Sequence, residues 1–222
     1  DHRFTVHHVG FHTNAQSRRL AALGAHASVN PYYIHALADN YGLFGLGRER
    51  ADQIVRAGSM VRNGMRVSFH SDFMMAPMEP LMLAWCAATR ITRSGRNISP
   101  EEMLDIHQAL RGITIDAAFA LHLDHEIGSI SAGKLADFAI LEDDPYELGA
   151  ETLKNIRVSG TVFEGEVNLL PAPVSSILAN QAPRPTQRKS KYRSVGGSCC
   201  EADADPCIFL RQLVSVLNQA HA

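Results

Sequence analysis

The chain has 222 residues, and 45% of them are hydrophobic, which is enough apolar surface for at least one sizeable core. Its 21 basic and 23 acidic residues give a formal net charge of -2, a balance that excludes a general nucleic-acid or membrane-surface role. No apolar run reaches the roughly eighteen residues of a membrane helix, and four cysteines are too few for a disulfide framework, so we expect a cytoplasmic protein.

The first 125 residues predict three repeats of a strand followed by a helix. The strands are predicted at 4–9, 25–31 and 66–71, and the helices are predicted to begin at Asn14, near Arg48 and at Pro80. This alternation is typical of right-handed βαβ units built around a parallel sheet. Residues 32–47 contain three glycines, and we expect them to form a long loop that acts as a lid.

Two further helices are predicted before the character of the chain changes. Ser99 precedes Pro100, and Glu102 follows three residues after Ser99, which is the pattern of a capping box at a helix start. Behind it, Met103, Ile106 and Leu110 supply the buried stripe of one helix. A second, short helix is predicted at 114–123.

Residues after 126 predict β structure and then an irregular tail. Apolar β runs occur at 136–141 and 156–168, where Glu164 and Gly165 suit a tight hairpin turn. The tail is rich in Pro, Ser, Gln and basic residues and closes with a short amphipathic helix near 208–218. We therefore divide the chain into three parts: a partial barrel at 1–126, a small β segment at 127–170, and a linker and tail at 171–222.

Polar side chains stand where each of the three predicted strands ends. They are His7 and His8, Asn30 and Pro31, and Ser71 and Asp72. In a parallel sheet these ends meet at one edge, where loops carry ligands and catalytic groups above a rigid scaffold. Imidazole and carboxylate groups together suit a divalent metal such as zinc. Two structural alternatives stay open, since a strand histidine is often a hydrogen-bonded core residue and an Asp at a strand end often caps the next helix.

Five stretches follow one another as they do in the amidohydrolase superfamily: "HRFTVHHV", "LAALGAHASVNP", "FHSDFMMAPMEPL", "AATR" and "IGSISAGKLADFAILEDDPYE". Over residues 2–170 the chain resembles family 3 of that superfamily, which includes N-substituted formamide deformylase-like enzymes. The resemblance implies an α/β fold, the C-terminal part of a (β/α)8 TIM-type barrel with strands six to eight, followed by a small β-sandwich segment.

The same resemblance implies roles for the residues at the strand ends. Asp72 would bind the metal and shuttle the proton, and His8 would be a metal or substrate contact. The implied cofactor is one or two divalent ions, with zinc as the first candidate. Four residues would line the pocket of a small-molecule substrate: Asn30, Pro31, His70 and Ser71. If Asp72 faces the barrel interior, period-two alternation predicts that Ser68 and His70 face inward too.

The sequence also departs from the family pattern. The family often has Glu where His7 stands and Gly where His70 stands. These residues lack three features of the family's metal site: the His-x-His of strand one, the strand-four ligand and the strand-five histidine. We therefore expect the C-terminal portion of a larger enzyme, inactive alone, whose partner is the missing N-terminal half of the barrel; homo-oligomer formation stays open. Such a portion would have unpaired strand edges and an inner face open to water.

The expected function is hydrolysis of a non-peptide C–N bond by a metal-activated water, with Asp72 as general base and acid. Two alternatives stay open. One is a non-catalytic, amidohydrolase-like regulator or binding protein, and the other is a deaminase that acts on a heterocycle.

Overall fold

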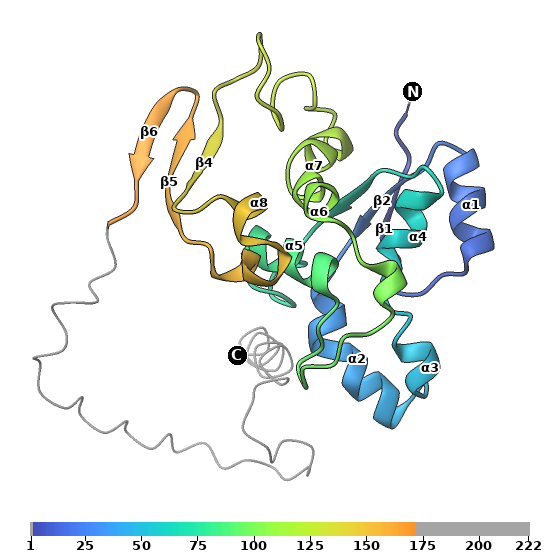
Figure 1. The fold of residues 1–222 in the computed structure, drawn as a ribbon. Coiled ribbons are helices and arrows are strands. Elements are labelled where there is room, and N and C mark those ends of the chain that lie inside the picture. Colours follow the sequence, from blue (N-terminus) through green and yellow to red (C-terminus); the bar gives the residue numbers. More distant parts are fainter. Residues whose placement is uncertain (1, 172–222) are drawn as a thin grey trace, which may run out of the picture. The chain divides into compact units, whose positions relative to one another are not determined.

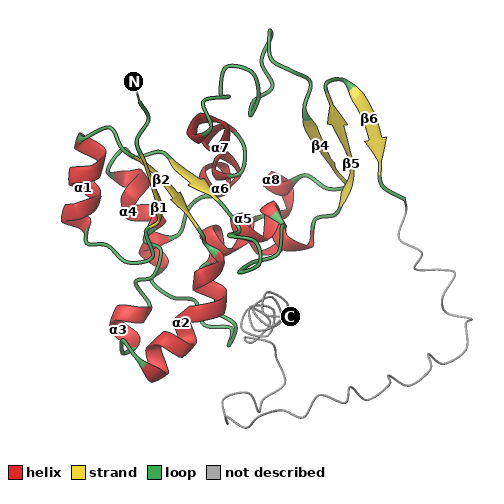
Figure 2. Ribbon diagram, turned by 180° about the vertical axis from the view of Figure 1, so that it is seen from behind, coloured by secondary structure: helices red, strands yellow, loops and turns green. Residues whose placement is uncertain are grey.

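The computed structural model describes residues 2–171, which include two small sheets and the helices between them (Figures 1 and 2). Residues 1–170 form one compact unit. The predicted linker and C-terminal helix lie outside the described residues. Across 2–171, no helix has the length and apolarity needed to cross a membrane.

The three predicted strands of the first part form one parallel sheet. They are β1 (Thr5–His8), β2 (His26–Val29) and β3 (Val67–Phe69), in the order β1-β2-β3. Thr5 pairs with His26, and Ser28 pairs with Ser68. The α/β class and the parallel βαβ repeats are therefore confirmed, because each strand is followed by helices that return the chain to the same end of the sheet.

Helices surround this sheet and connect its strands (Figure 1). The α-helices are α1 (Asn14–Ala22), α2 (Tyr32–Phe44), α3 (Arg48–Ala51), α4 (Ala57–Arg62), α5 (Pro80–Thr89), α6 (Ile106–Gly112), α7 (Ile115–Ala120) and α8 (Pro145–Leu148). Two 3-10 helices complete the set: η1 (Pro100–Glu102) and η2 (Ala150–Asn155). Cys86 lies buried in α5.

Alternation along the strands gives the parallel sheet two different faces. One face carries Ser28 and Ser68, and the other carries Val29 and Phe69, which belong to the main hydrophobic core. Phe69 packs so closely on α6 that a Cβ placed on Gly112 would come within 2.7 Å of its ring. The apolar face thus packs on helices, on the side of the sheet away from Ser68.

The polar face is not open to water along β2 and β3, so that prediction was wrong for these strands. His26 is only 1% exposed, and its ring centroid lies 5.7 Å from that of Phe119 in α7. The guanidinium groups of Arg3 and Arg66 lie over the same Phe119 ring, at 4.0 and 4.3 Å from its centroid. Ser68 lies 2.8 Å from His26 Nε2 and is buried with it, so solvent reaches mainly β1, where His7 and His8 are exposed.

Burial of His26 predicts that acid destabilises the fold. Burial lowers its pKa to about 4, from 6.5 in the unfolded chain. Between these values the unfolded state binds more protons, so the free energy of unfolding falls as the pH drops from 6.5 toward 4, by about 3 kcal/mol for this group. Urea unfolding of the 222-residue chain at pH 7 and pH 4 measures the loss. A His26→Gln chain should lose less stability on acidification, and an equal loss in both chains would contradict the assignment.

The predicted lid at 32–47 was wrong, because α2 occupies most of it. Pro31 has helical dihedral angles (φ -63°, ψ -20°) and starts the helix, while the side-chain oxygen of Asn30 accepts a hydrogen bond from the Tyr32 amide at 3.0 Å. The glycines of the segment fall only in its last turn or beyond it, where they do not interrupt the helix. The first helix begins at Asn14, as predicted, and Thr13 caps it in a box with Gln16.

The capping box predicted at Ser99 does not form. The Ser99 hydroxyl instead donates to the Asp52 carbonyl at 2.8 Å and accepts from the Gln53 side chain at 2.7 Å. Glu102 turns into the core, where it is 0% exposed and accepts from Arg56 Nε at 3.0 Å, so it does not reach back to Ser99. The α-helix therefore begins later, at α6, under a box made by Asp105 and Gln108.

A second, antiparallel sheet follows α7. Its strands are β4 (Phe138–Leu141), β5 (Val158–Phe163) and β6 (Glu166–Leu169), in that order. Glu164 and Gly165 both have positive φ (49° and 87°), as a two-residue hairpin turn of the primed type requires, so the predicted turn is confirmed. The described residues show one sheet in this region. A complete β-sandwich and the boundary at 126/127 stay predictions.

Candidate active site

The carboxyl ends of the three parallel strands bring four of the predicted site residues to one edge of the sheet. His8 ends β1, Asn30 follows β2, and Ser71 and Asp72 come shortly after β3. Because the strands are parallel and in register, these residues come from segments far apart in the chain but meet at the same edge.

His8 and Asp72 approach each other through left-handed backbone conformations. His8 has φ 65° and Asp72 has φ 49°, a region that non-glycine residues rarely adopt. Strict alternation would place His8 on the same face as Val6. The turned backbone instead brings its Nδ1 atom to 3.9 Å from Asp72 Oδ2. Both side chains are about half exposed, 48% for His8 and 47% for Asp72, so a ligand can reach them.

Tyr33, in the first turn of α2, contacts both of these residues. Its hydroxyl lies 3.0 Å from His8 Nδ1 and donates to Asp72 Oδ2 at 3.5 Å. The Tyr33 and His8 rings are stacked, with centroids 6.3 Å apart and planes 9° from parallel. Burial, together with the Asp72 carboxylate, raises the pKa of Tyr33, so the phenol stays protonated at neutral pH.

Asn30 ties the end of β2 to the end of β3. Its side-chain amide is 0% exposed and donates to the Ser71 carbonyl at 2.9 Å, while its oxygen accepts from the Tyr32 amide at the start of α2. Pro31 is buried at the helix start. These contacts hold the loops that carry Tyr33 and Asp72, and direct substrate contact by Asn30 and Pro31 stays a prediction.

His70 stands next to His8 at the same edge. Its ring is edge-on to that of His8, with centroids 4.7 Å apart, and edge-on to that of His7 at 6.1 Å. Its Nε2 atom is buried and has no hydrogen-bond partner among the described residues. Burial lowers the pKa of His70, and the neighbouring His8 ring lowers it further, so the imidazole is neutral at pH 7.

The donor atoms at this edge fit part of a divalent metal site. His8 supplies an imidazole and Asp72 a carboxylate, and the neutral His70 has a buried nitrogen without a partner. In the described part of the chain, no three His, Cys, Asp or Glu side chains come together as a metal-binding group. His8 and Asp72 therefore fit two ligands of such a site, and a complete site would need further ones.

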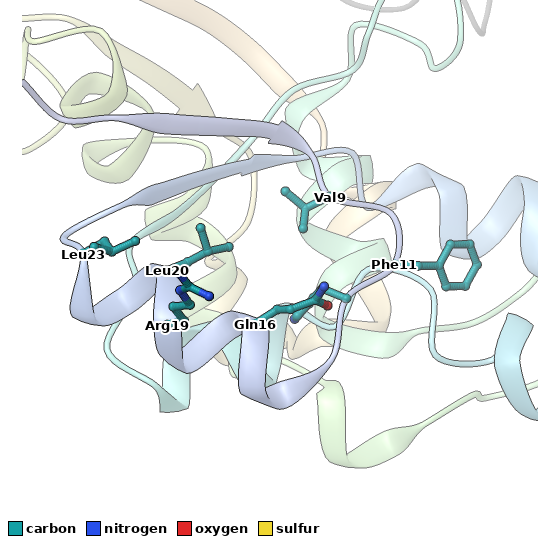
Figure 3. Close-up of a pocket in the computed structure, with 7 residues that line it drawn as sticks. Val9, Phe11, Gln16, Arg19, Leu20 and Leu23 are labelled. Atoms are coloured by element: carbon teal, nitrogen blue, oxygen red, sulfur yellow. The ribbon is translucent and has the colours of Figure 1, made fainter.

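Two hollows lie near these strands. One, of about 310 Å³, is formed between the end of β1 and α1 (Figure 3) and is lined by Val9, Phe11, His12, Gln16, Arg19, Leu20 and Leu23. Neither His8 nor Asp72 lines it. A smaller hollow of about 190 Å³ lies after β3 and is lined by Phe69, His70, Ser71, Met78, Glu79, Pro80, Leu83, Ile113 and Ala117. This second hollow brings two predicted substrate-binding residues, His70 and Ser71, into one mostly apolar depression.

A model of the amidohydrolase family matches residues 1–168. The chain belongs to the amidohydrolase family. Among curated relatives, the N-substituted formamide deformylase of Arthrobacter pascens is 29% identical over 72% of this chain and 30% of its own length. The protein LONG AFTER FAR-RED 3 of Arabidopsis thaliana is 33% identical over 66% of this chain and 25% of its own. This amidohydrolase-family chain thus spans under a third of the length of these relatives.

Solved structures show the same fold relationship. An adenosine deaminase from Xanthomonas campestris, with bound zinc, superposes with a TM-score of 0.54 over 81% of this chain and 41% of its own, at 18% identity. At that identity the likeness bears on the fold alone, and it agrees with the α/β class of this amidohydrolase-family chain.

Tyr33 was not among the residues that the sequence predicted for the site. It lies within residues 32–47, whose glycines predict a loop. The signal that could have placed it is Pro31 directly before two tyrosines, followed by Ile34 and Ala38, which are buried at helical spacing. A helix starting there puts Tyr33 in its first turn, beside the strand ends.

Proposed function

We propose that this chain is the C-terminal part of a metal-dependent amidohydrolase that cleaves a non-peptide C–N bond. It would supply barrel strands six to eight, as β1, β2 and β3, followed by the β-sandwich segment. The observation that carries the proposal is the pair formed by His8 and Asp72, 3.9 Å apart at the carboxyl edge of a parallel sheet and half exposed. The family match and the deformylase relative support the reaction class.

Each side chain at this edge has a role that suits its position. A divalent ion, with zinc as the first candidate, would lower the pKa of a water molecule and polarise the substrate carbonyl. His8 and Asp72 would each be a ligand of this ion or, where two ions bind, of neighbouring ones. Asp72 would also accept a proton from the attacking water and return it to the leaving nitrogen, which needs a carboxylate that solvent and substrate can reach. His70 and Ser71 would contact the small-molecule substrate at the hollow beside β3.

The unpaired outer sides of strands β1 and β3 support the proposal of a partner segment. Within the described residues, β1 and β3 each pair with β2 alone, so each has a free outer edge. In a closed barrel such edges pair with further strands. The proposed partner is the N-terminal half of the barrel, which would bring the remaining ligands; a homo-oligomer of the whole protein is compatible with this arrangement.

Metal removal tests the proposal in the full-length protein that carries this chain. Dialysis against a chelator should reduce the hydrolysis of an N-substituted formamide to about 1% or less, because an unassisted water is a poor nucleophile at neutral pH, and zinc should restore it. Formate release measures the rate, and ammonia release from an aminated heterocycle, assayed in parallel, detects a deaminase. Full activity after chelation would contradict the proposal, and no turnover of either substrate with metal present would favour a non-catalytic binding protein.

A further inference from the structure

We propose that Tyr33 is a positioning residue that holds the proton of His8 on Nδ1 and so leaves Nε2 free to bind the metal. The inference rests on the proposed function in treating His8 as a metal ligand. It goes beyond that function by assigning a residue, and a tautomer, on which the ligand depends.

The hydroxyl of Tyr33 stands between two groups that could each accept its one proton. His8 Nδ1 is 3.0 Å away, and Asp72 Oδ2 is 3.5 Å away. A tyrosine hydroxyl can donate one hydrogen bond while it accepts another. The three groups can therefore form a short chain of hydrogen bonds, and its direction decides which nitrogen of His8 carries the proton.

Only one direction of hydrogen-bond donation satisfies both contacts of the Tyr33 hydroxyl. If Tyr33 donates to Asp72, its oxygen can accept from a protonated His8 Nδ1, and both hydrogen bonds form. If Tyr33 donates to His8 Nδ1 instead, the contact with Asp72 loses its donor and the proton of His8 moves to Nε2. A carboxylate is also the stronger acceptor, because hydrogen bonds to a charged oxygen are stronger than those to a neutral nitrogen. The first direction is therefore favoured.

Donation from Tyr33 to Asp72 also leaves His8 in a tautomer that can bind a metal. A metal binds an imidazole nitrogen through its lone pair, and the hydrogen bond at the other nitrogen decides which one is available. Nδ1 is the His8 nitrogen that faces both Tyr33 and Asp72, at 3.0 and 3.9 Å, so with the proton held there the lone pair of Nε2 is the one left for an ion. Tyr33 would thus act on the metal through His8, without touching the ion itself.

Tyr33 is well anchored for this task. It follows Tyr32, whose amide is held by the Asn30 side chain at 3.0 Å, and it precedes Ile34, which is 0% exposed. Its ring lies parallel to that of His8, within 9°, so the stack restrains the orientation of the imidazole. The loop that carries Asp72 is held by the same Asn30 through the Ser71 carbonyl, at 2.9 Å.

The test compares Tyr33→Phe with the wild type in the full-length protein, and uses Tyr32→Phe as the matched control. Tyr32 stands on the same helix turn, but its ring lies next to His35, with centroids 5.7 Å apart. The first readout is the 15N chemical shifts of the His8 ring in the metal-free protein near pH 8, assigned by their loss in His8→Gln. We expect a protonated Nδ1 in the wild type and in Tyr32→Phe, and a mixture of tautomers in Tyr33→Phe.

The second readout is zinc affinity, which should fall about 10- to 100-fold in Tyr33→Phe and stay within about twofold of the wild type in Tyr32→Phe. A wild-type His8 with its proton on Nε2, or an unchanged tautomer in Tyr33→Phe, would overturn the inference. The tautomer is measured without metal or substrate. Lack of hydrolysis with the Nδ1 tautomer present would therefore reject the proposed function and leave the role of Tyr33 standing.

Discussion

Replacing Asp72 by Asn in the full-length protein is expected to lower kcat for amide hydrolysis by about 10³-fold or more. Asn has nearly the same size and can still accept a hydrogen bond from Tyr33, so the local structure should persist. It cannot accept a proton from water, however, and it is a much weaker metal ligand than a carboxylate. Both losses act on the chemical step, so kcat should fall more than the substrate KM changes.

Steady-state kinetics with an N-substituted formamide measures this effect. Asp143→Asn is a suitable control, because it makes the same chemical change at an exposed position between β4 and α8. The control should keep activity within about twofold of the wild type, as expected for a surface substitution away from the site. Thermal unfolding checks that both variants are folded. Activity of Asp72→Asn within about tenfold of the wild type would remove Asp72 from the mechanism.

The largest expected effect on stability belongs to Arg90, at the C-terminal end of α5. The Arg90 side chain is 0% exposed and donates hydrogen bonds to four backbone carbonyls. These are Ile98 from Nε at 2.8 Å, Val55 from Nη1 at 2.7 Å, and Ile54 and Asp52 from Nη2 at 2.8 and 3.0 Å. One guanidinium thus ties α5 to the turn between α3 and α4 and to the segment before η1.

Arg90→Lys keeps the positive charge but should lower the free energy of unfolding by about 3–5 kcal/mol. The guanidinium of arginine is a planar fork that can donate in several directions at once. A lysine ammonium is a single nitrogen, so it cannot reach all four carbonyls. Buried carbonyls would lose their donors, and the charge would be only partly solvated by the protein. Urea unfolding of the 222-residue chain measures the change.

Arg93→Lys is the matched control, since Arg93 is exposed three residues further along. It should change the free energy of unfolding by less than about 0.5 kcal/mol, as surface substitutions usually do. If Arg90→Lys costs less than about 1 kcal/mol, the four carbonyls do not depend on the guanidinium in solution.

Much of this fold follows from patterns that are local in the chain. The strands at β1, β2 and β3, the start of α5 at Pro80, and the hairpin turn at Glu164 and Gly165 were all predicted. Each depends on neighbouring residues, because alternation, proline at a first helical turn and glycine at positive φ act within a few residues. The meeting of His8 and Asp72 at one edge also followed, since parallel strands bring their carboxyl ends together.

Two predictions of local structure were wrong, and in both cases competing signals were present in the sequence. Glycines between 42 and 47 suggested a loop, but Pro31 and the hydrogen bond from the Tyr32 amide to Asn30 start α2 before them. Ser99 and Glu102 have the pattern of a capping box, but Glu102 is 0% exposed and is used by Arg56 and Ser59 instead. A buried carboxylate needs a counter-charge and hydrogen-bond donors, and here Arg56 and Ser59 supply them from the start of α4, more than forty residues away.

The amino-acid sequence alone was enough to predict the α/β class, the order of strands and helices in the first part, and Asp72 at a strand end. The tertiary structure was needed to turn His8 toward Asp72 and to place Tyr33 between them, 25 residues from one and 39 from the other. Alternation is a property of a single strand and is visible in its residues. A hydrogen bond across the ends of three segments depends on left-handed backbone angles and on helix packing, and no local pattern records either.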